Sequence, residues 1–466
     1  MKIFWENEVI YDTKSRSKIK ELHFVENLLA FISNNKGKIH FDNVMAGKDQ
    51  IFEAVSGDTV WRQVDGIRSK EDLLYHHEIG KPKRWTQLNY NISRYYFNII
   101  AAELKKEFNK NNAFQYLLDP CYHDVDLYLG LSKTAKCGYS FNECEPFKIY
   151  EDVNQIDINS FYSSIMRTKK FPHSFKKIPT SYFGECCKNK AYFFGYFRIK
   201  INSYDCFLAK MGDYDGYNKT IEGYFNNIDF SFLKLLCGIK SVDVKELWIC
   251  DKWGYLPEGI IKAIDYCYSK KEELSNPNKP ERIKYKLALE RFYGNCLKER
   301  FYKTSKVWNE EKQELETVNN KFEFTVEFRE KAFKGYFHYA WGVWVCSYAR
   351  YELLRCKKEL GSNCLYGDVD SLKFIGDGHF NFSSSLGAWK NEGKLKSFRA
   401  IDLKWYIGEY DLEDSSNKDK NEKLKIACSG ADKTIMEEWL NNCEDPISSF
   451  SKTSFPENIK PYKTLV

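Results

Sequence analysis

The sequence has no long apolar segment and no strong excess of charge of either sign. No run approaches the roughly 20 apolar residues needed to span a bilayer, and the start of the chain lacks the apolar core of a signal peptide. We therefore expect a cytoplasmic protein that does not act in a membrane.

The cysteines lack the spacing of a zinc site. The chain has 15 cysteines, and none forms a C-x-x-C pair. Cys186 and Cys187 are adjacent, which suits no common structural metal site. An odd number of scattered cysteines is typical of reduced thiols in a reducing compartment.

The composition allows a packed core but gives little hint of a ligand. The 466 residues suffice for two or three domains, and 43% of them are hydrophobic. The 71 positive and 65 negative residues leave a net charge of +6. Binding to nucleic acid would therefore require the positive charge to gather in one cleft.

Periodicity predicts several elements in the last two-thirds of the chain. An acidic turn separates the last two strands, and residues 411–422 read as a charged loop. The predicted elements are a helix over 93–108, a strand, turn and helix over 149–166, two helices over 259–298 with a break at 275–280, a hairpin with strands at 302–308 and 321–328, a helix over 340–360, and strands at 364–366 and 372–375.

Two acidic segments suggest metal-assisted phosphoryl transfer. Asp157 ends an apolar strand, and Asp368 and Asp370 stand in a tight turn between two strands. Two-metal catalysis needs carboxylates that converge on cations about 3.5–4 Å apart, and magnesium prefers such oxygen ligands. If the D-x-D lay on a strand, its two carboxylates would share one face. Each segment alone also fits an ordinary solvated turn.

A helical segment lies between the acidic ones. Lys286, Glu290 and Tyr293 fall on one side of this helix. The lysine could reach triphosphate oxygens, and the tyrosine could pack on a base or sugar. Alone, the segment equally fits an amphipathic helix with a glycine near its end.

Together the three segments resemble motifs A, B and C of family B DNA polymerases, in the family's order. The matching residues are Asp157–Ile165 (D-x-x-S-L-Y-P-S-I), Lys286–Gly294 (K-x-x-x-N-S-x-Y-G) and Tyr366–Ser371 (Y-x-D-T-D-S). Three further segments resemble the protein-primed, phi29-like subgroup: Leu386–Trp389, Leu403–Ile407 with its K-x-Y, and Lys425–Lys433. The resemblance covers about two-thirds of the chain, from Gly138 to the C-terminus.

The resemblance implies an α+β fold with the polymerase right hand of palm, fingers and thumb, preceded by a small N-terminal α/β domain over 1–137. Within the polymerase domain, 138–466, the implied parts are a palm (138–182 and 361–410), an insertion (183–254), fingers (255–300), a second insertion hairpin (301–335) and a thumb (411–466). By position, the first insertion would contact a terminal protein that primes synthesis, and the second would encircle the template.

The resemblance also implies roles for single residues. The catalytic carboxylates would be Asp157, Asp368 and Asp370. Two Mg²⁺ ions, for which Mn²⁺ could substitute, would be bound by Asp157, Asp370 and the backbone carbonyl of Ile158. The nucleotide would be bound by Tyr162 as steric gate, Lys271, Arg282, Lys286, Tyr293 and Gly294, and the primer terminus by Lys404 and Tyr406. The implied partners of a monomeric enzyme, working in the cytoplasm of a host cell, are template and primer DNA, deoxynucleotides and a terminal protein.

Two features depart from the family. Glu290 occupies the usual asparagine position, so a carboxylate would stand close to the triphosphate. The N-terminal third has no D-x-E of the family's proofreading exonuclease, although Asp42 resembles a remnant of its second motif and Tyr122 and Asp126 satisfy Y-x-x-x-D. We expect an exonuclease-like or unrelated DNA-binding domain without 3′–5′ exonuclease activity.

Two other functions remain open. A reverse transcriptase has a similar palm, but its motif C carries two adjacent aspartates, whereas Val369 separates Asp368 from Asp370 here. A catalytically impaired polymerase that serves as a DNA-binding replication factor would account for Glu290 and for the eroded N-terminal third.

Overall fold

The computed structural model divides into two compact units, residues 1–99 and 100–466, and we treat each by itself. The residues that it describes are the strands at 2–6, 9–12, 18–21, 40–46, 50–53 and 62–64, and then 119–451 and 455, apart from gaps at 137, 204–207, 209–210, 275–279, 299, 301–303, 310–313, 320–324, 334–336, 415–416, 418–422, 430 and 432. The helix predicted over 93–108 lies outside the described residues.

The first unit contains a six-stranded sheet in the order β3-β2-β1-β4-β5-β6. In its centre, β1 pairs with β2 in antiparallel and with β4 in parallel orientation. The strands are β1 (Lys2–Glu6), β2 (Val9–Asp12), β3 (Lys18–Glu21), β4 (His40–Ala46), β5 (Gln50–Glu53) and β6 (Arg62–Val64).

The second unit is built around a seven-stranded antiparallel sheet in the order β20-β19-β18-β8-β17-β16-β7. Its central strand β8 (Tyr150–Ile158) pairs with β17 (Ser371–Ile375) and β18 (Trp389–Asp402). The other strands are β7 (Ser140–Asn142), β16 (Cys364–Asp368), β19 (Trp405–Tyr410) and β20 (Leu424–Cys428). Both predicted strands that flank the acidic turn are confirmed.

Apolar side chains cover both faces of this sheet. On one face, Val153 packs in a cluster with Tyr366 and Phe398. On the other, Ile156 and Leu372 join the core that α11 (Tyr339–Leu360) helps to form. Burial of alternate residues on each side fixes the register, because a slip of one residue would exchange the two faces.

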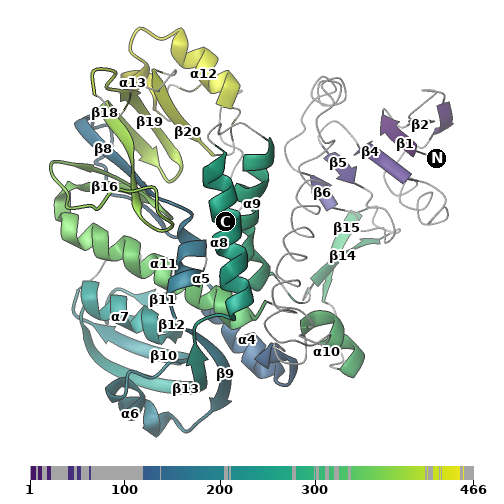
Figure 1. The fold of residues 1–466 in the computed structure, drawn as a ribbon, viewed down its shortest axis with the longest axis vertical. Coiled ribbons are helices and arrows are strands. Elements are labelled where there is room, and N and C mark those ends of the chain that lie inside the picture. Colours follow the sequence, from purple (N-terminus) through teal and green to yellow (C-terminus); the bar gives the residue numbers. More distant parts are fainter. Residues whose placement is uncertain are drawn as a thin grey trace. The chain divides into compact units, whose positions relative to one another are not determined.

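Three helices adjoin the carboxyl end of β8. A turn with Ser160 in the left-handed region (φ 47°) leads from β8 into α5 (Phe161–Thr168). The helices α8 (Glu258–Glu273) and α9 (Pro280–Cys296) pack side by side (Figure 1). The predicted strand–turn–helix, the helix pair and the helix at 340–360 are therefore confirmed.

A second sheet in this unit has the order β11-β12-β10-β13-β9. It contains β9, which precedes residue 183, and its core includes Leu353 and Leu354 of α11. The strands are β9 (Phe171–Lys177), β10 (Phe193–Ile201), β11 (Asp213–Asp215), β12 (Thr220–Asn226) and β13 (Ile239–Gly254); the helices are α6 (Phe183–Lys188) and α7 (Asn227–Leu236). Residues 183–254 therefore share a core with the rest of the unit.

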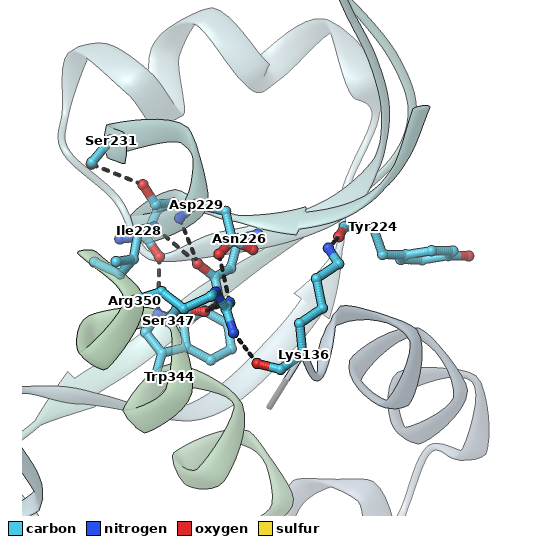
Figure 2. A network of polar contacts seen from close by, with 10 residues as sticks. Lys136, Tyr224, Asn226, Ile228, Asp229, Ser231, Trp344, Ser347 and Arg350 are labelled. Atoms are coloured by element: carbon cyan, nitrogen blue, oxygen red, sulfur yellow. Dashed lines mark hydrogen bonds and ion pairs between the residues drawn. The ribbon is translucent and has the colours of Figure 1, made fainter. Parts of the chain in front are cut away.

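A buried polar network joins this second sheet to α11 (Figure 2). Arg350 of α11 forms an ion pair of 2.9 Å with Asp229 of α7, and both side chains are almost fully buried. Asn226 donates to Ser347 at 2.8 Å. Removing one partner of such a pair leaves a buried charge and typically costs ~3–5 kcal/mol of stability, so the network fixes α7 on α11.

The predicted hairpin is present, but its second strand lies earlier in the sequence than predicted. The strands are β14 (Thr304–Asn309) and β15 (Glu314–Asn319), and α10 (Val326–Phe333) follows. The alternating apolar residues at 321–328 suggested a strand. Instead, the Thr325 hydroxyl accepts from the N–H of Phe328 at 3.1 Å, which is how threonine caps a helix N-terminus.

Shorter helices complete the described part of the unit. Near its start lie a 3-10 turn at Pro120–Tyr122 and α4 (Val125–Thr134); near the C-terminus, α12 (Lys433–Asn441) and α13 (Pro446–Ser449) pack on β19 and β20. No helix in the described segments is long and apolar enough to cross a membrane. Of the charged loop predicted at 411–422, residues 411–414 form a turn and most of the rest lies outside the description.

Candidate active site

Strand pairing brings Asp157 and Asp370 together. Asp157 is the penultimate residue of β8 and stands opposite Ser371 of β17. The N–H of the next residue, Ile158, donates to the Asp370 carbonyl at 2.9 Å. All three predicted metal ligands, Asp157, Ile158 and Asp370, line one cavity of about 690 Å³.

Asp368 stands apart from that cavity. It ends β16, and the chain then turns through Val369, which has a φ of 58°. The Asp368 carboxylate accepts from the Ser140 hydroxyl at 2.5 Å and lies 3.8 Å from the Lys404 ammonium. The D-x-D thus spans a turn, and the rule that alternate strand residues share a face does not apply to it.

The two cavity carboxylates repel one another. Burial raises the pKa of Asp157 to about 7, with further contributions from Asp370 and Glu392. Burial, with Asp368 and Glu290 adding to it, raises the pKa of Asp370 to about 6. A cation between these carboxylates would relieve the repulsion, as expected of a pair that binds divalent metal.

The ligand set suits magnesium better than a structural metal. No group of three or more His, Cys, Asp or Glu side chains is arranged to bind a metal ion anywhere in the described residues. Magnesium is commonly bound by one or two carboxylates, with waters and substrate phosphates completing its shell. Asp157, Asp370 and the Ile158 carbonyl fit that pattern.

Basic side chains of α8 and α9 line the same cavity. Lys271, Arg282 and Lys286 are among its lining residues. Lys271 is only 7% exposed, and its ammonium lies 3.2 Å from the Ser160 hydroxyl. Burial lowers the pKa of Lys271. The cavity therefore holds Asp157 and Asp370 together with three basic side chains of the helices, and the acidic Glu272 of α8 also lines it.

Glu290 lies in this cavity, as its position in the motif predicts. Its carboxylate is 3.6 Å from the ammonium of Lys286, one helical turn away. Both side chains are more than half exposed. Glu290 thus forms an ion pair with Lys286, the lysine of the motif that would bind the triphosphate.

Two tyrosines from different helices stack at the cavity. The ring of Tyr162 on α5 lies 3.8 Å from that of Tyr293 on α9, with 22° between the planes. Tyr162 lines the cavity, whereas Tyr293 is not among the lining residues. Gly294 is not among the lining residues, and a Cβ there would meet no atom within 4 Å.

Lys404 and Tyr406 lie beside Asp368. The N–H of Lys404 donates to the Tyr366 hydroxyl at 2.6 Å, and the Tyr406 ring is 5.1 Å from that of Tyr366. Neither residue lines the cavity that holds Asp157 and Asp370.

Sequence reasoning missed the cavity residues on β18. Lys390 pairs with Asp157 across the strands and lies 2.5 Å from Glu392. Both line the cavity. Lys390 directly follows the recognised segment Leu386–Trp389, but only the strand register shows that it stands opposite Asp157, while Glu392 lies at the register shift between Asn391 and Gly393.

The exonuclease candidates fall in different units. Asp42 lies on β4 of the first unit, and Asp126 lies in the first turn of α4 in the second. This distribution leaves the expected lack of exonuclease activity as a prediction.

Comparison with known proteins identifies the fold of the chain. No family model matches the chain, and no curated protein matches its sequence. Solved structures of phi29 DNA polymerase match the chain. The complex with primer-template DNA and incoming nucleotide has a TM-score of 0.57 and 13% sequence identity, over 92% of this chain and 90% of that one. The complex with single-stranded DNA has a TM-score of 0.60 and 13% identity over the same shares of the two chains, and an orthorhombic crystal form has a TM-score of 0.59 and 14% identity, over 94% of this chain and 92% of that one. The chain has the fold of a phi29-like DNA polymerase.

Proposed function

We propose that the protein is a DNA-directed DNA polymerase that adds deoxynucleotides to a 3′ hydroxyl. The observation that supports it most is one cavity in which Asp157 and Asp370 face Lys271, Arg282 and Lys286. A polymerase requires both kinds of side chain in one cavity, because metals need carboxylates and the triphosphate needs cations. The fold is that of an enzyme solved with primer-template DNA and nucleotide.

Asp157, Asp370 and the Ile158 carbonyl would bind two Mg²⁺ ions, with Mn²⁺ as a substitute. When bound, such ions activate the attacking hydroxyl and stabilise the leaving oxygen. Asp368 has a supporting role: its contacts with Ser140 and Lys404 fix the acidic turn.

The helix side would bind the nucleotide. Lys271, already oriented by Ser160, and the more exposed Arg282 and Lys286 attract the triphosphate. Tyr162, held by its stack on Tyr293, would lie under the sugar and exclude a 2′ hydroxyl. Gly294 would shape the base-pair pocket, and Lys404 and Tyr406 would bind the primer terminus.

In this proposal the seven-stranded sheet is the palm, α8 and α9 are the fingers, and the segment from β20 onward belongs to the thumb. The five-stranded sheet is the insertion, and β14 with β15 is the second insertion.

The test is extension of a labelled DNA primer. Wild-type protein should extend it with Mg²⁺, while Asp157→Ala and Asp370→Ala should bind the DNA but not extend it. Asp243→Ala, an exposed aspartate of β13, is the matched control and should behave as wild type. Binding without extension by the wild type would favour a replication factor, and preference for an RNA template would favour a reverse transcriptase.

Protein-primed initiation is a second proposed activity. It is favoured by the inserted five-stranded sheet, on which Arg198 and Lys200 of β10 are exposed. Deletion of 183–254 would remove part of the shared core, so point variants are the better test. Arg198→Glu with Lys200→Glu should spare extension of a DNA primer but abolish transfer of a labelled first nucleotide to the protein encoded beside this gene. Unchanged transfer would contradict this role for the sheet.

A further inference from the structure

Lys373 is a buried lysine on the strand next to that of Asp157. It lies on β17, is 2% exposed and pairs with Gln155 of β8 and with Tyr366 of β16. Paired residues project from the same face of a sheet, as do residues two apart on a strand. Lys373 therefore lies on the face that carries Asp157.

Three aromatic rings surround its ammonium. Nζ of Lys373 lies 4.2 Å from the ring centroid of Tyr406, 5.2 Å from that of Tyr366 and 5.9 Å from that of Phe398. The Tyr406 ring is itself 5.1 Å from Tyr366 and 5.6 Å from Phe398. A cation this close to a ring is attracted to its face, most strongly where water is excluded.

Packing alone does not explain a charged side chain here. Burial lowers the pKa of Lys373 to about 7, and Lys425 lowers it further. The carboxylates that oppose this shift are those of Asp368, Asp157 and Glu392. An apolar side chain of the same length would fill the space without the cost of desolvating an ammonium.

The neighbouring side chain is also polar. Gln155 is 1% exposed, and neither its amide oxygen nor its amide nitrogen has a hydrogen-bond partner in the structure. Lys373 and Gln155 thus form a polar layer within an otherwise apolar cluster, where buried polar groups normally have partners. We expect such a layer to serve the site rather than stability.

The rings around Lys373 lead to the residues proposed to bind the primer terminus. The Tyr366 hydroxyl accepts from the N–H of Lys404, whose φ is 59°. Few non-glycine residues adopt that conformation without support. Tyr406, whose ring is closest to the ammonium, follows two residues later.

We propose that Lys373 is a positioning residue for the primer terminus. Its ammonium fixes the ring of Tyr406 and, through Tyr366, the backbone of Lys404. This rests on the proposed polymerase function. Because Lys373 is not among the cavity-lining residues that would bind nucleotide, its loss should weaken binding of the primer terminus and spare binding of the deoxynucleotide.

The first test replaces the charge and retains the length. Lys373→Met should raise the Kd for primer-template DNA about tenfold, measured by anisotropy without nucleotide. The KM for deoxynucleotide should stay at the wild-type value, and the unfolding midpoint should not fall, because methionine avoids the cost of burying an ammonium. Lys240→Met, an exposed lysine of β13, is the control and should change none of them. Lys373→Gln is made in parallel, so that the test stands if the Met variant does not fold.

The second test is a double-mutant cycle with Tyr406→Leu, which removes the ring. If Lys373 acts through that ring, Lys373→Met should change the Kd much less in the Tyr406→Leu background than in the wild type. Additive losses, an unchanged primer Kd, or a raised nucleotide KM with an unchanged primer Kd would each overturn the proposal. Failure of the wild type to extend any primer would instead refute the polymerase function, since the Kd is measured separately.

Discussion

Replacing Glu290 by glutamine should tighten nucleotide binding, although Glu290 lies within motif B. Its carboxylate lies 3.6 Å from the Lys286 ammonium and lines the cavity proposed to receive the triphosphate. The substitution keeps the shape of the side chain, frees Lys286 and removes one negative charge.

The expected magnitude is modest because the pair is exposed. Helical pairs of this spacing contribute about 0.3–0.5 kcal/mol, and removing a like charge near the triphosphate contributes about 1 kcal/mol at water-like screening. The KM for deoxynucleotide should therefore fall about tenfold. Because Glu290 also raises the pKa of Asp370, the acid limb of the activity profile should move to lower pH.

The assay is steady-state single-nucleotide addition at several salt concentrations. Glu273→Gln is the matched control, since Glu273 pairs with Lys270 on α8 at 2.6 Å and does not line the cavity. The gain should shrink as salt increases. An unchanged or higher KM in Glu290→Gln would refute this reasoning and show that Glu290 assists nucleotide binding.

Further predictions concern pH, sugar selection and trimming. The pKa of Asp157 in the folded protein is raised to about 7, so the buried charged carboxylate destabilises the fold above that pH. This destabilisation decreases as the pH falls from about 7 toward the lower pKa that Asp157 has in the unfolded chain. Asp157→Asn should therefore raise metal-free stability at pH 8 by at least ~1 kcal/mol and have little effect near pH 4, as thermal unfolding would show. Tyr162→Val should increase the ratio of ribonucleotide to deoxynucleotide incorporation, and an unchanged ratio would locate the gate elsewhere. The protein should not trim single-stranded DNA from its 3′ end; trimming that survives Asp370→Ala but is lost in Asp42→Ala or Asp126→Ala would contradict this.

Local patterns predicted the elements that position the site. The apolar run before Asp157 and the helical spacing after it correctly predicted β8 and α5, and the Pro-rich break correctly separated α8 from α9. The motifs also predicted a phi29-like polymerase fold, which the chain shares with a solved structure at only 13% sequence identity.

Other features depended on long-range pairing that no local pattern contains. Lys390 and Glu392 enter the cavity because β18 pairs with β8, which places Lys390 opposite Asp157, a residue 233 positions earlier (390 − 157 = 233). No local pattern singles out Lys373, because the rings around its ammonium come from β16, β18 and β19. The strand prediction over 321–328 was wrong because the Thr325 hydroxyl caps a helix there, despite the alternating apolar residues of this segment.

The most direct measurement is extension of a labelled, self-priming DNA hairpin by the purified protein with deoxynucleotides, with and without Mg²⁺. The proposal predicts template-directed addition that requires Mg²⁺ and disappears in Asp370→Ala while the hairpin remains bound. Binding of the hairpin without any addition, or addition that persists in Asp370→Ala, would contradict the assignment of this site to DNA synthesis.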